Sequence, residues 1–167
     1  MPTLTMIEKV NIQINQVSFA SQWCLTHSTW CAAHALQGSA TLMRECAQRN
    51  ISQMTHLFNF SRKHGIIPVV NHRLPEYCEY SSLVDLLQQA LDNISPCHQT
   101  LSELESEAFE HNNLSAGLFF ESLNLQQYQE SQLLHTALIE AQAAQRQGAD
   151  LQQIDSQLLA LLDKMIH

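Results

Sequence analysis

Residues 46–60 have the sequence CAQRNISQMTHLFNF, which carries a clear helical repeat. The positions that recur at steps of four and three residues are Cys46, Asn50, Gln53, Leu57 and Phe60. Steps of this size place side chains on one stripe of an α-helix. The segment therefore predicts a core helix in which two uncharged amides, Asn50 and Gln53, lie inside an apolar stripe.

The same spacing of apolar residues continues on both sides of this segment and predicts further helices. It runs from Val10 to Ala35 before the segment, and from Leu83 to Ala108 after it. Only four glycines and four prolines interrupt 167 residues, which favours long helices. We expect a single domain over residues 1–167, with helices at about 6–35, 39–64, 81–111, 115–147 and 150–165.

Residues 65–80 differ from the rest, because they contain the short apolar run IIPVV and a second proline, Pro75. This connection is too long for a simple helical hairpin. A long crossover between two helix pairs is one of the known topologies of four-helix bundles. The predicted fold is therefore all-α, a four-helix bundle with a long connection between its second and third helices and a short fifth helix.

Several residues are expected at helix ends or breaks. Gly38 should break the chain between the first two helices. The expected N-cap residues are Ser81 or Ser82, Ser115 and Asp150. Pro96 falls inside the third helical pattern, where a proline costs about 3 kcal/mol. Either one helix kinks there or two shorter helices meet. We favour the kink, because the apolar rhythm continues in phase across Pro96.

Charge and hydropathy narrow the class of protein. The formal net charge is −8, which disfavours binding to nucleic acid or to an anionic membrane. The sequence has no run of 18 apolar residues, so no membrane span is expected. Residues 1–10 lack the basic region and apolar run of a signal peptide, and we expect a cytoplasmic protein.

The five cysteines are odd in number, and none forms a C-x-x-C pair. In a cytosolic chain this argues against a disulfide framework. Four of them fall on predicted core stripes, where a cysteine behaves as a small hydrophobic residue. The alternative is a soft-metal or redox cluster of Cys24, Cys31 and Cys46, although their spacing matches no recognised ligand pattern.

Parts of the chain resemble bacterial non-haem ferritins, and most closely their B-type ferritin-like paralogue in enteric bacteria. The similarity covers residues 6 to about 137, and the segment after Gly148 matches only in helical character. It rests on MIEK at 6–9, Asn11, Gln13, Asn15, Trp30-Cys31, Gly38, Arg44, Ala47-Gln48, Leu57-Phe58, Gly65, Pro68 and EYSSL at 79–83. The resemblance implies a ferritin-like bundle that assembles into a hollow shell of 24 subunits.

The resemblance also implies a di-iron ferroxidase centre, built from ligands on all four helices. The expected glutamates of the first and third helices are here Val17 and Ile94. The expected Glu-x-x-His of the second helix is Asn50-x-x-Gln53. The fourth helix keeps Gln127 and Glu130 as remnants of the metal site. Valine and isoleucine cannot bind iron, and amides bring no charge, so we predict an inactive centre and no ferroxidase activity.

Arg49 stands where the family has an acid of a third iron site. We hypothesise that an ion pair between Arg49 and Glu130 replaces the iron charge and lets the bundle fold without metal. The alternative is that Arg49 points to solvent, because buried ion pairs are costly.

Three further candidates are weaker. Glu103, Glu107 and Glu110 have helical spacing and could guide or nucleate iron near a subunit junction, or form an ordinary solvated face. His167 at the end of the fifth helix could contribute to a metal-binding ring on a symmetry axis. The haem ligand of bacterioferritins is absent, because Ile51 stands at its position, so no haem is expected.

Three functions remain open from the sequence. The first is an iron-storage subunit that holds ferric mineral or weakly bound iron, alone or mixed with a ferroxidase-active ferritin subunit. The second is a non-catalytic structural or regulatory protein that assembles with an active ferritin. The third is a ferroxidase with relocated ligands, which should still need Glu130.

Overall fold

Five α-helices account for most of the chain in a computed structural model that describes residues 3–71, 73–76 and 78–166. Each helix begins and ends within two residues of the range expected from the sequence. The helices are α1 (Leu4–Ala33), α2 (Gln37–Lys63), α3 (Leu83–Glu110), α4 (Leu114–Arg146) and α5 (Leu151–Ile166).

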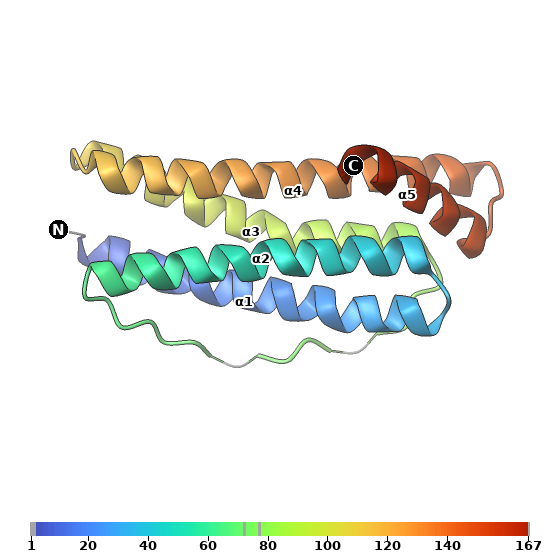
Figure 1. Cartoon of the computed structure of the whole chain (residues 1–167), viewed down its shortest axis with the longest axis horizontal. Coiled ribbons are helices and arrows are strands. Elements are labelled where there is room, and N and C mark those ends of the chain that lie inside the picture. Colours follow the sequence, from blue (N-terminus) through green and yellow to red (C-terminus); the bar gives the residue numbers. More distant parts are fainter. Residues whose placement is uncertain (1–2, 72, 77, 167) are drawn as a thin grey trace.

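The first four helices lie side by side along the long axis of the molecule (Figure 1). α1 packs chiefly against α2, and α3 packs chiefly against α4. The connection from α2 to α3 runs back along the outside of the bundle, so that α2 and α3 point the same way (Figure 1). This arrangement confirms the predicted all-α bundle with one long crossover. α5 packs across one end, against α2 and α4.

The turn between α1 and α2 differs from the prediction. Gly38 does not break the chain but lies within the first turn of α2. The reversal occurs at Ala35, which has a φ of 59°, while the amide of Leu36 donates to the carbonyl of Cys31 at 2.8 Å. Gly38 is instead needed for helix packing, because a Cβ there would lie 2.4 Å from the backbone oxygen of Asp155 in α5.

The helix caps follow the expected chemistry with one shift in register. The Ser82 hydroxyl accepts from the amide of Val84 at 3.2 Å, and the Asp150 carboxylate accepts from the amide of Gln153 at 2.9 Å. For α4 the N-cap is Asn113, whose side chain accepts from Ala116, and the expected Ser115 lies inside the helix. A cap two residues earlier gives α4 two additional exposed residues at its start, Leu114 and Ser115.

Pro96 lies inside a single helix, since α3 is continuous from Leu83 to Glu110. The alternative of two shorter helices is therefore wrong. The buried residues Ile94 and Cys97 on either side of the proline keep their inward positions. None of the described helices has the length and hydropathy that crossing a membrane requires.

The bundle interior contains two separate apolar clusters. One includes Cys24, Cys46, Ile94 and Leu134, and the other includes Val17, Leu57, Cys97 and Leu123. Along α2 and α4 the buried residues between the two clusters are polar. A polar layer at mid-length therefore separates the two halves of the core.

Candidate functional site

The polar layer consists of Asn50 and Gln53 from α2 and Gln127 and Glu130 from α4. All four are at most 1% exposed, as the helical spacing predicted. Steps of three residues, 50 to 53 and 127 to 130, place both members of each pair on the inward face of their helix. Val17 of α1 and Ile94 of α3 are also fully buried.

Asn50 connects the two helices through its side-chain amide. Its Nδ2 donates to Oε1 of Glu130 at 2.7 Å and to the backbone carbonyl of Cys46 at 2.8 Å. Its Oδ1 accepts from Nε2 of Gln127 at a longer 3.4 Å. The amide nitrogen therefore faces the carboxyl group, so Asn50 acts there as a donor and not as a ligand with a free oxygen.

Gln53 makes a second connection between α2 and α4. Its Nε2 donates to the carbonyl of Leu123 at 3.0 Å and to Oε1 of Gln126 at 3.1 Å. The Oε1 atoms of Gln53 and Gln127 are buried and find no hydrogen-bond partner among the residues that the structure describes. The layer is thus held mainly by amide donors, and two of its acceptor atoms are unsatisfied.

Burial raises the pKa of Glu130 to about 8, and this effect outweighs the hydrogen bond from Asn50 and the positive charge of Arg49, which both lower it. At neutral pH the group is therefore chiefly a neutral carboxylic acid. A proton resides where a metal ion would otherwise balance the charge. The layer can consequently remain buried without a cation.

Arg49 pairs with a different carboxylate from the one expected. Its Nε lies 3.2 Å from Oε1 of Glu45, one turn earlier on α2, and both side chains are about one-third exposed. In the part of the chain that the structure describes, no ion pair joins Arg49 to Glu130. Pairing with Glu45 keeps the guanidinium partly hydrated, whereas pairing with Glu130 would bury it at a high desolvation cost.

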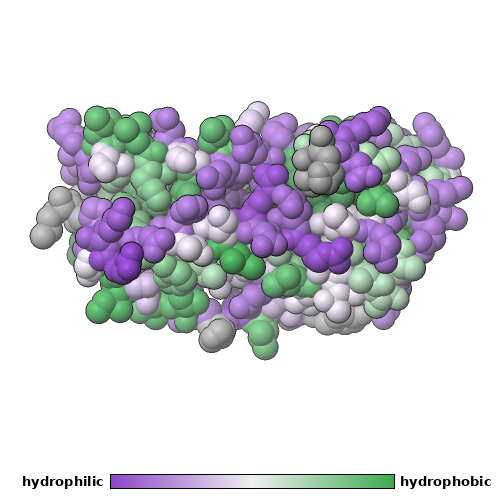
Figure 2. Space-filling view, in the orientation of Figure 1, coloured by the Kyte–Doolittle hydropathy of each residue, from purple (hydrophilic) through white to green (hydrophobic). Residues whose placement is uncertain are grey.

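A surface pocket of about 300 Å³ lies over this region, lined by Glu45, Arg49, Ser52, Gln53, Gln126, Gln129 and Glu130. All of these residues belong to α2 and α4. Figure 2 shows hydrophilic side chains gathered across the middle of the face formed by these helices. Glu130 is therefore the buried residue in the lining of a polar pocket that opens to the surface.

The residues of the layer do not suit a di-iron centre. Val17 and Ile94 have no donor atom, and the nitrogen of Asn50 faces Glu130. Among residues 3–71, 73–76 and 78–166, no three His, Cys, Asp or Glu side chains come together to hold a metal. A rebuilt centre from relocated ligands therefore finds no support in the described residues.

The cysteines behave as core residues. Cys24, Cys31, Cys46 and Cys97 are buried, and Cys78 is exposed. A hydrogen bond with Cys24, followed by burial, raises the pKa of the Cys46 thiol, and burial raises those of Cys31 and Cys97 to about 12. Protonated thiols are poor ligands. The alternative metal cluster of Cys24, Cys31 and Cys46 is therefore not formed among the described side chains.

Comparison with known proteins identifies the family. The chain is 33% identical over 167 residues, the whole of both proteins, to a bacterial non-heme ferritin-like protein of Escherichia coli strain K12. The chain belongs to the bacterial non-heme ferritin-like proteins. It is also 29% identical to a bacterial non-heme ferritin of Escherichia coli O6:H1, with 93% of this chain and 94% of the relative covered. No protein-family model matches the chain.

A solved structure supports the fold of this ferritin-like chain. Ferritin of Chlorobium tepidum aligns with a TM-score of 0.80 at 22% identity, covering 87% of this chain and 88% of that one. The four-helix bundle with its long crossover is therefore a ferritin fold.

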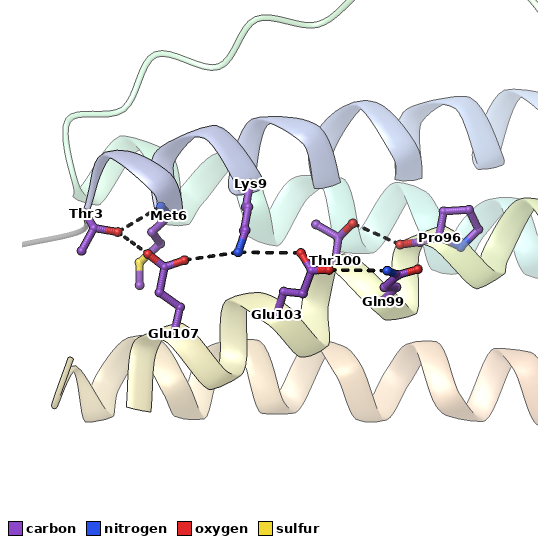
Figure 3. A network of polar contacts seen from close by, with 8 residues as sticks. All are labelled: Thr3, Met6, Lys9, Pro96, Gln99, Thr100, Glu103 and Glu107. Atoms are coloured by element: carbon purple, nitrogen blue, oxygen red, sulfur yellow. Dashed lines mark hydrogen bonds and ion pairs between the residues drawn. The ribbon is translucent and has the colours of Figure 1, made fainter. Parts of the chain in front are cut away.

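The acidic stripe on α3 is partly neutralised by a lysine of α1 that the sequence analysis did not connect to it. The ammonium of Lys9 in α1 lies 3.7 Å from Oε2 of Glu103 and 3.6 Å from Oε2 of Glu107 (Figure 3). The hydroxyl of Thr3 donates to the other oxygen of Glu107. A cation of the protein itself thus occupies the space between two of the three acids.

The two remaining candidates from the sequence are Glu110 and His167. Glu110 and His111 line the same pocket of about 550 Å³ as Lys9, Glu103 and Glu107, and both are exposed. His167, proposed for a metal-binding ring, lies outside the described residues.

Proposed function

We propose that this chain is a subunit of an iron-storage shell whose bundle centre does not oxidise iron. The observation that carries the proposal is the polar layer, in which an amide network and a neutral Glu130 stand where the family resemblance implies an iron-binding set of carboxylates and a histidine. The ferritin fold and the family relationship support assembly into a shell of 24 subunits in the cytoplasm.

Iron is here the cargo of the shell and not a cofactor of the subunit. An acidic chain of net charge −8 attracts cations to the shell surface. Without a ferroxidase centre, Fe(II) has to be oxidised slowly by dissolved oxygen, or by a ferroxidase-active ferritin subunit in a mixed shell. The enzyme activity would then belong to the partner.

A second function is favoured by the Lys9 contacts. Because Lys9 lies between Glu103 and Glu107, the most acidic stripe of α3 is partly neutralised and is a weak place to nucleate ferric mineral. In this alternative the chain is a non-catalytic structural or regulatory subunit that assembles with an active ferritin.

The test is aerobic oxidation of Fe(II) by the size-purified protein at about two irons per subunit, the load of a di-iron centre, against a protein-free blank. We expect a rate close to that of the blank. A rapid phase that Glu130→Ala abolishes would contradict the proposal and indicate a rebuilt centre. A positive control combines Val17→Glu, Asn50→Glu, Gln53→His and Ile94→Glu, which restores the implied ligands next to Glu130 and should gain a rapid phase.

Iron retention separates the two functions. Purified shells loaded slowly with Fe(II) and then desalted should retain iron if the chain stores it. If shells of this chain alone retain none, and mixed shells retain no more iron than their ferroxidase-active subunits account for, the regulatory or structural function is correct.

A further inference from the structure

Tyr80 and His27 form a buried polar pair far from the polar layer, at the end of the bundle where the crossover joins α3. Tyr80 is 8% exposed and His27 is 1% exposed. The phenolic oxygen lies 3.2 Å from Nε2 of His27, and 2.9 Å from Oε1 of Gln89, to which the hydroxyl can donate. The function proposed above uses none of these residues, and no sequence pattern joins a histidine of the first helix to a tyrosine of the crossover.

The direction of the hydrogen bond between them follows from the other ring nitrogen. Nδ1 of His27 lies 2.7 Å from the backbone carbonyl of Trp23. A carbonyl oxygen only accepts, so Nδ1 carries a hydrogen. Burial lowers the pKa of His27, so the ring is neutral at physiological pH and Nε2 has a free lone pair. The hydroxyl of Tyr80 is the donor available to satisfy it.

Gln89 can accommodate this direction. Its side chain is exposed, and its amide can turn so that nitrogen instead of oxygen faces the phenol. The amide then donates to the phenolic oxygen while the phenol donates to His27. All the polar atoms at the phenol are satisfied in this arrangement, whereas donation from the phenol to Gln89 would leave Nε2 of the buried imidazole without a partner.

We propose that Tyr80 is a one-electron redox site, with His27 as the built-in acceptor of its proton. In the forward step Tyr80 gives one electron to an oxidant, and its phenolic proton moves to Nε2 of His27. The products are a neutral tyrosyl radical, an imidazolium ion and the oxidant reduced by one electron. A one-electron reductant reverses the step, and the proton returns from Nε2 to the phenolic oxygen.

The surroundings make the histidine necessary for this chemistry. Burial raises the pKa of Tyr80 to about 12, so the phenol does not ionise before it loses an electron. An oxidised phenol that kept its proton would be a cation in an apolar site, which is costly. Transfer along the existing hydrogen bond removes the proton from the phenol and places the charge on an imidazole that already donates to the Trp23 carbonyl.

Aromatic rings surround the pair and can pass an electron to or from it. The ring of Trp23 stacks on His27 with centroids 3.9 Å apart, and Trp30 meets Tyr80 edge to face at 5.7 Å. Oxidants of the right class are oxygen radicals, such as the hydroxyl radical that Fe(II) makes from hydrogen peroxide, which takes one electron and becomes hydroxide. Only this source of oxidant rests on the proposed storage function; the redox chemistry of Tyr80 does not.

The experiment uses the full chain in its assembled form, without iron, so that its outcome is independent of the storage function. Flash photolysis of ruthenium(II) tris-bipyridine with persulfate supplies a one-electron oxidant, and the tyrosyl radical is followed by transient absorbance and electron paramagnetic resonance. We expect Tyr80→Phe to remove the dominant radical and His27→Leu to slow its formation at least tenfold. Radicals at Tyr77 and Tyr128 remain as the background in every variant.

His34→Leu is the matched control. His34 repeats the geometry of His27 seven residues later, with Nδ1 2.8 Å from the carbonyl of Trp30 and its ring stacked on Trp30. Among the described residues, the phenol of Tyr80 is hydrogen-bonded to His27 and Gln89 and not to His34. It should leave radical formation unchanged. If His27→Leu forms the radical as fast as the wild type, or if Tyr80→Phe leaves the signal intact, the proposal is wrong.

A second measurement needs no substitution. Solid-state NMR of the ¹⁵N-histidine-labelled wild-type protein reports the tautomer of each ring. We expect His27 to be neutral with its hydrogen on Nδ1. A hydrogen on Nε2 would prevent that nitrogen from accepting the phenolic proton and would overturn the proposal even if the variants fail to fold.

Discussion

Replacing Glu130 by glutamine should make the protein more stable at alkaline pH and change little at acidic pH. The wild-type carboxyl has an ordinary pKa of 4.5 when unfolded and about 8 when folded. Below pH 4.5 both states hold the proton. Between these two pH values only the unfolded state loses it, so the free energy of unfolding falls as the pH rises, and above pH 8 the loss is complete.

The size of this effect follows from the difference between the two pKa values. The folded-state pKa of about 8 lies about 3.5 above the unfolded value, and at about 1.36 kcal/mol for each tenfold change in the acid constant this corresponds to about 5 kcal/mol. Glutamine has the shape of the neutral acid and can still accept from Nδ2 of Asn50, now 2.7 Å from Oε1 of Glu130. It does not titrate, so Glu130→Gln should avoid most of this loss.

The assay is urea unfolding of both proteins from pH 4 to 9 at one fixed subunit concentration, because assembly contributes to the apparent stability. The difference in free energy of unfolding between variant and wild type should rise with pH and level off near pH 8. Glu121→Gln removes an exposed carboxylate from the same helix and should change stability by less than about 0.5 kcal/mol throughout. A difference for Glu130→Gln that does not vary with pH would refute the assignment of a neutral buried acid.

Three further substitutions test contacts that place α5 and α1. Gly38→Ala should destabilise the protein by about 1–3 kcal/mol, because the new Cβ would lie 2.4 Å from the Asp155 backbone oxygen in α5. This steric cost should exceed the gain from the better helix propensity of alanine, so an increase in melting temperature would contradict the prediction. Asp155→Asn should lower the free energy of unfolding by about 1.5–3 kcal/mol, since the carboxylate accepts from the amides of Gly38 at 2.9 Å and Ser39 at 2.7 Å. The variant should also expose α5 to proteolysis, and α5 cleavage at the wild-type rate would count against this prediction. Lys9→Gln should increase terbium binding, measured by luminescence, because Glu103 and Glu107 lose the ammonium between them; equal binding by wild type and variant would show that Lys9 does not control this pocket.

The inward faces of the helices could be predicted from the sequence, because a helical repeat depends only on residue spacing. Asn50, Gln53, Gln127 and Glu130 all lie in the core as their positions indicated. The Glu-to-Val and Glu-to-Ile differences implied by the family resemblance likewise needed no coordinates, because hydrocarbon side chains have no metal-binding atoms.

Partners across helices could not be predicted in the same way. For Arg49 the sequence left open a pair with Glu130 or a position in solvent, and in the structure it pairs with Glu45 on its own helix. The choice depends on the relative cost of burying a guanidinium and of protonating an acid, which is set by the depth of each group. The sequence gives residue types but not depths within a layer.

The prediction of the turn between α1 and α2 was wrong for a related reason. Glycine is the usual residue at a positive φ, but Ala35 takes that conformation here, and Gly38 serves the close approach of α5. A glycine needed for backbone freedom and a glycine needed for close packing are identical in the sequence.

The sequence by itself thus determined an all-α bundle with a long crossover, its inward stripes, and the residue types that form the central polar layer. These follow from local periodicity and from the chemistry of single side chains. Only the tertiary structure decided that Asn50 donates to Glu130, that Lys9 lies between two acids of α3, and that Tyr80 meets His27. Each of these contacts joins segments distant in the chain, and its geometry is fixed by how whole helices pack against one another.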